Sequence, residues 1–444
     1  MITYSIIKKS QLEGAHRLDA EFYCVSNDIS GDFVLGEDAV EFVQYGTSKE
    51  LNEERKGFPV LRLNEFDDFF ITTPEKYCNK ISEEVFNSLK LKAGDVLICR
   101  TNGNPKFVGK SAVVLEDTEI AFASYLFRVR PKKEVISPES LAAFLNSKAG
   151  RTQIERFLMP SIQSNFSPAQ FRAIKIPLLS REKQDEIDDS VRKSFSLRNN
   201  SLALYSQAEN LLLEELGLSN FKAEEELFSV VKLSEVKNVN RIDAEYFQPK
   251  YEKLSVQLKK SSAKKLEEVI ENVAAKFDAA KQPDEMFKYV ELSNINASTG
   301  IIDGFSEVLG KEAPSRAKRV LKVDDVIVSS VEGSLEKAAL VHEDQKDFLA
   351  STGFFQFRSK EILPEVILIL AKSPIFQWQL EKRCAGTILT AVPKESIKDI
   401  LIPVLPKSIQ QKIAELVRQS HEARKKAKEL LEEAKRKVEE MIEG

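Results

Sequence analysis

The sequence predicts an α+β protein in which one mixed α/β unit occurs twice and each copy is followed by a long helix. Similar stretches recur along the chain at a nearly constant spacing. Two long charged segments contain no proline or glycine in their interiors, as expected of long helices. Four regions follow: a first globular domain (residues 1–178), a first long helix (179–217), a second globular domain (218–404) and a second long helix (405–444).

Four pairs of similar stretches define the repeat. Their separations all lie between 224 and 230 residues, which is hard to obtain by chance over so much of the chain. The pairs are Arg17–Tyr23 (RLDAEFY) with Arg241–Phe247 (RIDAEYF), Leu91–Val96 with Leu321–Val326, Phe127–Arg130 with Phe355–Arg358, and Ile176–Ile187 with Ile402–Ile413. Two copies with divergent middles indicate two related surfaces that bind different ligands.

Each copy contains short apolar runs typical of strands, followed by a helical segment. The runs are rich in branched and aromatic residues and are bounded by turn residues. The helical segments, Pro138–Phe157 and Pro364–Lys382, each begin with proline. Gly217 is expected to end the first long helix. The predicted strands are Phe58–Leu63, Asp95–Cys99, Ala112–Leu115 and Ile120–Val129 in the first copy, and Phe287–Leu292, Asp325–Ser329, Ala338–Val341 and Phe348–Phe357 in the second.

The last forty residues have the apolar spacing of a coiled coil. A four–three alternation predicts a narrow seam, so this helix needs a partner of similar length. The equivalent helix of the first copy is that partner, with a predicted seam at Leu197, Ser201, Leu204, Ala208 and Leu211. Ser194 and Ser420 occupy seam positions where an apolar residue is expected, and mark either a splay or the entry of a partner. The C-terminal seam is Ile409, Ile413, Leu416, Ser420, Ala423, Ala427, Leu430, Ala434, Lys437 and Met441.

The composition is that of a globular protein of 444 residues with a net charge of −4. Four scattered cysteines without a C-x-x-C pair are expected to be free thiols, and three distant histidines argue against zinc. We expect no export signal and no membrane span, and therefore a cytoplasmic protein. The acidic balance argues mildly against DNA binding, but acidic helices can coexist with basic reading surfaces.

Motifs for catalysis are largely missing. Gly103–Ser111 resembles a phosphate-binding loop, but five residues separate its glycines where four are required, and Pro105 removes a backbone N–H. The second copy has no counterpart, so a turn with a basic tip is the preferred interpretation. No methylase, dinucleotide-binding or zinc-protease motif is found, and Asp19 and Asp243 are assigned structural roles.

The order of the repeated stretches resembles a known family. The chain carries the R-[LI]-D-A-E-[FY] opening twice, a buried Gly94–Ile98 strand, and an Ile-Pro strand before each long helix (Gln184–Ile187 and Gln410–Ile413 open the helices). These features, over essentially the whole chain, are similar to specificity subunits of type I restriction–modification systems.

The resemblance implies a non-catalytic, DNA-reading subunit. Each globular domain would be a target-recognition domain for one half of a bipartite site, and the helices would pack antiparallel as a coiled coil that sets the spacing. It implies methyltransferase (modification) subunits and a restriction/translocase subunit as partners. It implies no cofactor on this chain, with S-adenosylmethionine, ATP and Mg²⁺ confined to the partners.

Twelve polar residues in the variable loops are the candidate DNA contacts. Arginine can hold guanine and asparagine can hold adenine through two hydrogen bonds, while lysine mainly contacts phosphate. They are Lys49, Arg62, Arg100, Asn102, Lys106 and Lys110 in the first unit, and Lys276, Lys281, Arg316, Lys318, Arg319 and Ser330 in the second.

Three alternative functions remain open at this point. A nucleotide-hydrolysing enzyme rests only on the Gly103–Ser111 loop, and a nucleotide-binding assay tests it. A coiled-coil scaffold or adaptor explains the helices and the acidic balance but not two divergent α/β units, and salt-dependent DNA binding separates it from a DNA reader. An orphan or decoy specificity subunit would lack DNA-modifying partners.

Overall fold

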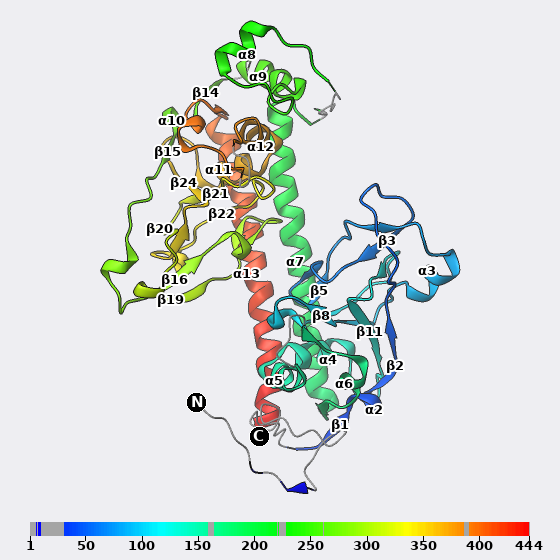
Figure 1. Ribbon diagram of the computed structural model, residues 1–444. Helices are drawn as coiled ribbons and strands as arrows, with labels where there is room; N and C mark the ends of the chain where they lie inside the picture. Colours follow the sequence, from blue (N-terminus) through cyan, green and yellow to red (C-terminus); the bar gives the residue numbers. More distant parts are fainter. Residues whose placement is uncertain are drawn as a thin grey trace. The chain divides into compact units, whose positions relative to one another are not determined.

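The computed structural model describes residues 6, 8–9, 31–158, 164–219, 221, 228–260, 262–385 and 390–443 (Figure 1). The first R-L-D-A-E-F motif, at Arg17–Tyr23, lies outside these residues, as do His16, Asp19 and Cys24. The chain forms two compact units. Unit 1 combines Met1–Leu197 with Lys425–Gly444, and unit 2 is Arg198–Arg424.

Unit 1 is built around a six-stranded sheet with the strand order β2-β11-β7-β9-β5-β4. β11 pairs antiparallel with both β2 and β7, and a separate sheet has the order β10-β3-β6. The elements are β1 (Phe33–Leu35), α2 (Gly36–Ala39), β2 (Val40–Tyr45), β3 (Phe58–Leu61), β4 (Phe66–Asp67), β5 (Phe70–Ile71), β6 (Tyr77–Cys78), α3 (Glu83–Leu89), β7 (Val96–Cys99), β8 (Thr101–Asn102), β9 (Ser111–Val113), β10 (Ala121–Phe122), β11 (Leu126–Pro131), α4 (Pro138–Asn146), α5 (Lys148–Phe157), β12 (Ser164–Asn165), α6 (Pro168–Arg172) and β13 (Lys175–Pro177).

Unit 2 contains two four-stranded sheets, β15-β24-β21-β22 and β19-β16-β23-β20. Its elements are α8 (Leu233–Val239), α9 (Pro249–Lys260), β14 (Ala263–Lys265), α10 (Leu266–Val269), β15 (Ile270–Asn272), β16 (Met286–Val290), β17 (Ile295–Asn296), β18 (Ile301–Ile302), β19 (Ser306–Leu309), β20 (Ala317–Val320), β21 (Val326–Ser329), β22 (Ala338–Leu340), β23 (Leu349–Ser351), β24 (Phe354–Ser359), α11 (Pro364–Lys372), α12 (Pro374–Glu381) and β25 (Leu401–Pro403).

The same strand pairings occur inside both units. β24 lies between β15 and β21 as β11 lies between β2 and β7, and all four pairings are antiparallel. The parallel pair β3–β10 of unit 1 has its counterpart in β16–β23 of unit 2. Most predicted strands are therefore present, but the single strands expected at 120–129 and 348–357 are each two strands that belong to different sheets.

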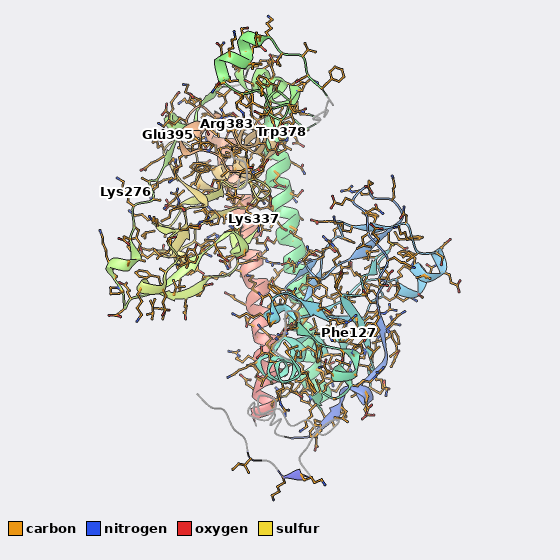
Figure 2. The ribbon with its side chains drawn as sticks, viewed as in Figure 1. Phe127, Lys276, Lys337, Trp378, Arg383 and Glu395 are labelled. Atoms are coloured by element: carbon orange, nitrogen blue, oxygen red, sulfur yellow. The ribbon has the colours of Figure 1, made fainter. Side chains whose placement is uncertain are left out.

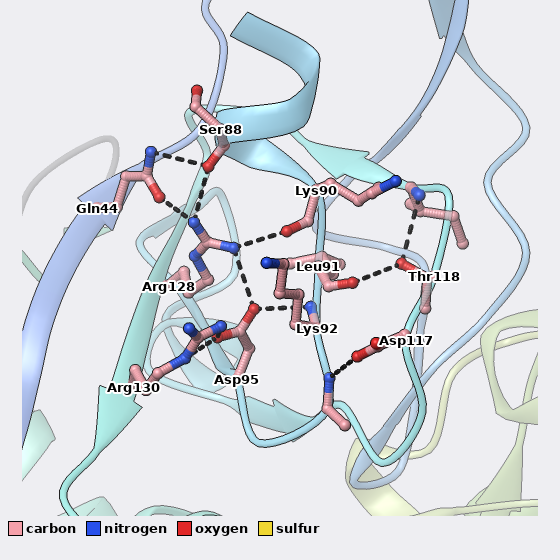
Figure 3. Close-up of polar contacts among 12 residues, drawn as sticks. Gln44, Ser88, Lys90, Leu91, Lys92, Asp95, Asp117, Thr118, Arg128 and Arg130 are labelled. Carbon is pink, nitrogen blue, oxygen red and sulfur yellow. Dashed lines mark hydrogen bonds and ion pairs between the residues drawn. The ribbon is translucent and has the colours of Figure 1, made fainter. Parts of the chain in front are cut away.

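A buried aspartate holds the turn before the central strand in each unit. In unit 1, Asp95 accepts hydrogen bonds from Arg128 Nη1 (3.0 Å), Arg130 Nε (2.9 Å) and the backbone N–H of Lys92 (2.9 Å), as Figure 3 shows. Arg128 also donates to the carbonyl oxygens of Lys90 and Ser88. Burial lowers the pKa of Arg128, and the adjacent Asp95 carboxylate opposes that shift.

Unit 2 repeats this arrangement with one substitution. Asp325 accepts from Arg358 Nε (2.9 Å), from Gln356 Nε2 (2.7 Å) and from the Lys322 N–H (2.9 Å). Gln356 stands where unit 1 has Arg128, so the carboxylate of unit 2 faces one cation instead of two. The stretches Leu91–Val96 and Leu321–Val326 are therefore similar because each contains a buried aspartate that holds the same turn.

The two helical segments after the sheets are each broken by a serine. α4 ends and α5 begins around Ser147, whose Oγ donates to Phe144 O (2.7 Å) and accepts from the Gly150 N–H (3.2 Å). Ser373 likewise donates to Leu370 O (2.7 Å) between α11 and α12. Serine offers the backbone local hydrogen bonds that compete with the helix, and Pro374 disfavours the helical conformation of the residue before it.

The two long helices are α7 (Arg181–Glu215) and α13 (Lys407–Glu443), and Gly217 follows α7 with a left-handed φ of 64°. Their buried residues recur with the expected four–three spacing, but the predicted seam is wrong by one residue at alternate positions. Tyr205, Leu212, Val417, Leu431 and Val438 are buried where Leu204, Leu211, Leu416, Leu430 and Lys437 were predicted.

The difference arises because the helices also cover the globular cores. In unit 1, Leu431, Ala434, Val438 and Ile442 of α13 belong to the core that includes the α4 residues Leu141 to Leu145. In unit 2, Ile413 and Val417 join the core of α11. A helix that contacts both another helix and a sheet layer buries a wider stripe than a coiled-coil seam.

Serines hold the helix segments together within each unit. In unit 1, Ser194 Oγ donates to Ala427 O (2.8 Å). In unit 2, Ser420 Oγ donates to Ser201 O (2.7 Å), and the two hydroxyls lie 3.0 Å apart. Ser194 and Ser420 are fully buried, so the helices are in contact at these positions and do not splay. Small side chains allow this close approach of two backbones.

We expect unit 2 to lose stability as the pH falls from 6.5 towards 4. His421 Nε2 donates to Thr299 O (2.8 Å), so its Nδ1 accepts from His342 Nε2 (3.0 Å). Burial, and then His342, lower the pKa of His421 to about 4. The unfolded chain therefore binds a proton that the folded state excludes, at a cost of about 2 kcal/mol at pH 5 and about 3 kcal/mol once the pH is below about 4. Lys372, whose pKa burial lowers to about 8, stays charged over this range.

Urea unfolding at pH 7.5 and pH 5 measures this loss. The His421→Phe variant provides the control, because unit 1 has Phe195 at the equivalent helix position. The variant should unfold with a much smaller dependence on pH. An equal pH dependence in both proteins would contradict the assignment to His421.

Candidate nucleic-acid interface

Four of the six candidate residues of unit 1, Arg100, Asn102, Lys106 and Lys110, lie on or next to the two-stranded ribbon formed by β8 and β12. In this ribbon Asn165 pairs with Thr101 and Ser164 with Asn102. Arg100, directly before β8, donates from Nε to Asn165 Oδ1 (3.1 Å) and from Nη1 to Ser124 O (3.1 Å). Asn102 Oδ1 accepts from the Asn104 N–H (2.8 Å) and shapes the turn that follows.

The turn after β8 carries exposed lysines. Pro105–Phe107 forms a short 3-10 helix between β8 and β9, so the Gly103–Ser111 stretch is a strand–turn–strand as expected and not a strand–loop–helix. Lys106 is exposed, and Lys110 Nζ lies 4.4 Å from the centre of the Phe107 ring. Partial burial lowers the pKa of Lys110 from its usual value.

Two further candidates of unit 1 lie on other elements. Lys49 is exposed in the loop between β2 and β3. Arg62, after β3, is half-buried and lies within 3.5 Å of both Glu65 and Glu75. Carboxylates next to Arg62 compete with any phosphate, so Arg62 is less available than Lys49.

In unit 2 the candidates divide into surface and interior residues. Lys276, Lys281, Arg316 and Lys318 are exposed, and Lys276 lies on the loop between β15 and β16 (Figure 2). The backbone joins this loop to β20, because the Phe277 N–H donates to Lys318 O (3.1 Å). Lys276 and Lys318 are therefore on neighbouring backbone segments of unit 2.

Arg319 and Ser330 are buried, with 2% and 8% of their surface exposed. Arg319 Nη1 donates to Val273 O (2.7 Å), and burial lowers the pKa of Arg319 to about 10. Ser330 Oγ donates to Gly353 O (2.9 Å). Strand alternation explains the first case, since Lys318 and Arg319 point to opposite faces of β20 and only Lys318 faces outward. Both residues support the unit from within.

Three residues near the β8–β12 ribbon were missed by sequence reasoning. Asn165 orients Arg100 although 65 residues separate them. Tyr45 and Tyr125 expose 49% and 51% of their surface, and the Arg100 guanidinium lies 5.2 Å from the Tyr45 ring. Exposed aromatic side chains are a signal of nucleic-acid or protein contact, but exposure is only visible once the strands are paired.

The two buried thiols with shifted pKa values are not activated for chemistry. Burial raises the pKa of the Cys99 and Cys384 thiols to about 11, so neither is a reactive thiolate. Within the described ranges, no group of three side chains is placed to hold a metal ion. None of the helices in the described part of the chain is both long and apolar enough to cross a membrane.

Comparisons with known proteins point to one class of protein. The type I restriction enzyme StySPI specificity subunit of Salmonella potsdam is 28% identical over 172 residues, which are 38% of this chain and 36% of that protein. The putative type I restriction enzyme MjaX specificity subunit of Methanocaldococcus jannaschii is 26% identical over 153 residues, or 34% and 36% of the two chains. The chain is similar to type I restriction–modification specificity subunits. Each match to a specificity subunit spans about a third of that relative's length.

A solved structure and the family models complete the comparison. The crystal structure of the type I restriction–modification S subunit from M. genitalium aligns over 94% of this chain and 96% of its own, with 13% identity and a TM-score of 0.41. No family model matches the chain.

Proposed function

We propose that this chain is the DNA sequence-recognition subunit of a type I restriction–modification enzyme and has no catalytic activity of its own. Residues 1–178 and 218–404 act as two target-recognition domains, each reading one half of a bipartite DNA site. The observation that carries the proposal is the repeated strand pairing of the two units combined with different loop residues at equivalent places. Variable loops on a repeated scaffold are suited to reading two different sequences.

The two long helices, residues 179–217 and 405–444, form an antiparallel coiled coil in this proposal. Two equivalent hydrogen bonds support it. Ser194 donates to Ala427 O, and Ser420 donates to Ser201 O. Ser194 and Ser201 of the first helix correspond, 226 residues later, to Ser420 and Ala427 of the second. Ten positions of α7 from Ile187 to Leu212 are buried, and nine of them match buried positions of α13 at that same shift. The pair sets the distance between the half-sites.

The outer charged faces of the helices then serve as docking surfaces for methyltransferase subunits, and a restriction/translocase subunit completes the complex. S-adenosylmethionine, ATP and Mg²⁺ belong to those partners, and this chain needs no cofactor. The exposed cations Lys49, Lys106 and Lys110 of unit 1, and Lys276, Lys281, Arg316 and Lys318 of unit 2, contact phosphates and base edges.

Exchange of one domain tests the proposal. We replace residues 1–178 with the first domain of another specificity subunit, and map the methylated sites of a host that produces the chimera with its modification subunits. One half-site should change completely, and the other half-site and the spacer should stay as they were, because residues 218–404 and both helices are unaltered. The reciprocal exchange of residues 218–404 is the control and should change the other half. A change of both half-sites in either chimera would contradict the assignment of one domain to each half.

A further inference from the structure

At the β8–β12 ribbon of unit 1, hydrogen bonds hold the Arg100 guanidinium group in a fixed orientation. Arg100 Nε donates to Asn165 Oδ1, and Nη1 donates to Ser124 O, so two of its three nitrogens are fixed in direction. Asn165 Oδ1 also accepts from Thr101 Oγ1 (3.3 Å), which holds the amide in place. Among the described residues no hydrogen bond to Nη2 is found, so Nη2 and the second hydrogen of Nη1 are available to form a parallel fork of the kind that matches the O6 and N7 atoms of guanine.

The surroundings of Arg100 suit a nucleic-acid base. The Tyr45 ring lies against the guanidinium, at 5.2 Å, and Tyr125 is half exposed in the β10–β11 turn, where its carbonyl oxygen accepts from the Arg100 N–H (2.8 Å). An arginine held by a ring and two acceptors loses little conformational freedom when it binds, so more of its interaction energy is available for discrimination.

Unit 2 contains the same ribbon with different side chains. The Phe166 N–H donates to Arg100 O in unit 1, and the Val392 N–H donates to Ser330 O in unit 2, both at 2.8 Å. In unit 2 Val331 pairs with Ala391, and the Glu332 N–H donates to Thr390 O (3.0 Å). The unit 2 ribbon thus has Ser330 in place of Arg100, Glu332 in place of Asn102 and Ala391 in place of Asn165.

The chemistry at the tip of the ribbon is therefore reversed between the units. Unit 1 offers a hydrogen-bond donor, the Arg100 fork. Unit 2 offers an acceptor, because Ser330 is buried and the exposed Glu332 carboxylate is the charged group next to it. A carboxylate accepts from the exocyclic amino group of cytosine or adenine and repels the acceptor edge of guanine.

We propose that this ribbon reads one base in each half-site. Arg100, positioned by Asn165, reads a guanine in the half-site of unit 1, and Glu332 reads a cytosine or adenine amino group in the half-site of unit 2. This inference rests on the proposed DNA-recognition function and assigns base classes to two named side chains.

The experiment selects duplexes from a pool of randomised DNA with the full-length chain assembled with its modification subunits. The DNA enriched by the wild-type protein is sequenced first. If it enriches a bipartite sequence, the recognition function stands and the ribbon can be tested separately. If it enriches no sequence, the recognition function itself fails, and the ribbon assignment falls with it.

Variants of Arg100 and Asn165 then test unit 1. Arg100→Lys keeps the charge but loses the fork, so the preference for guanine at one position of one half-site should fall roughly 5- to 150-fold, with other positions unchanged. Asn165→Ala should give a weaker version of the same single-position change, because Arg100 keeps its charge and its Ser124 acceptor but loses the acceptor at Nε. The control Lys106→Ala should weaken binding to all sequences alike. It should also reduce the salt dependence of binding by about the amount expected for one lost phosphate contact.

The Glu332→Gln variant tests unit 2 independently. Glutamine can hold adenine through two hydrogen bonds, so adenine should gain over cytosine at one position of the other half-site. Thermal unfolding of every variant checks folding. A loss of binding that is equal for all sequences, or a change in the same half-site for Arg100→Lys and Glu332→Gln, would overturn the proposal.

Discussion

Asp95→Ala is expected to destabilise unit 1 by about 3–5 kcal/mol, because it leaves a buried arginine without its counter-charge. The Arg128 side chain exposes only 6% of its surface and the Asp95 side chain none. The substitution also removes the acceptor for Arg130 and for the Lys92 N–H at the turn before β7. Equilibrium unfolding in urea, followed by circular dichroism, measures the loss.

An exposed ion pair of the same unit provides the control. Glu119 lies 2.7 Å from Lys90, and its side chain is 78% exposed. Solvent and salt screen such pairs, so Glu119→Ala should cost less than about 1 kcal/mol. Because Gln356 replaces the second arginine in unit 2, Asp325→Ala should cost less than Asp95→Ala. Equal and small effects of Asp95→Ala and Glu119→Ala would show that the buried network does not stabilise the unit.

Insertion of seven residues into both long helices is expected to lengthen the spacer of the DNA target and leave both half-sites as they were. Seven residues preserve the four–three spacing of buried positions and add about 10 Å of helix. That length corresponds to about three base pairs at 3.4 Å each. Equivalent insertion points, such as after Leu197 and after Ala423, keep the helices matched at the shift of 226 residues. Methylation mapping of a host that produces the variant gives the new spacer.

Insertion into one helix alone provides the matched control. It leaves seven residues unpaired and displaces Ser194 from Ala427, or Ser420 from Ser201, so the protein should unfold at a lower temperature and lose methylation. A double insertion that folds and methylates the original spacer would exclude the helices as the element that sets the distance.

The local sequence pattern was enough to predict much of the fold. The strands around Val96–Cys99 and Val326–Ser329 and both long helices are where periodicity and turn residues predicted them. The seam was misplaced because periodicity reports that a helix is amphipathic and not how many partners it has. Leu204 and Tyr205 are adjacent apolar residues, and only the contact of α7 with the core of unit 2 decides that Tyr205 is buried.

The candidate site was less predictable, for reasons visible in single residues. Arg100 and Lys106 could be chosen because they lie in a polar stretch directly after a buried strand. Arg319 could not be separated from Lys318 by type, because their difference lies in the face of β20 that each occupies. Asn165 could not be linked to Arg100, since only the pairing of β8 with β12 brings them together.

The division of α13 between the units has a consequence for how the protein is made. The core of unit 1 includes Leu431, Ala434, Val438 and Ile442, which leave the ribosome after the whole of unit 2, while the sheets of unit 1 leave before it. Unit 1 therefore has to wait for synthesis of the entire second unit before its core can close. Cleavage near residue 425 by a protease would remove these four residues from the core of a unit whose six-stranded sheet lies more than 290 residues earlier in the chain, so the stability of unit 1 depends on the segment after residue 425.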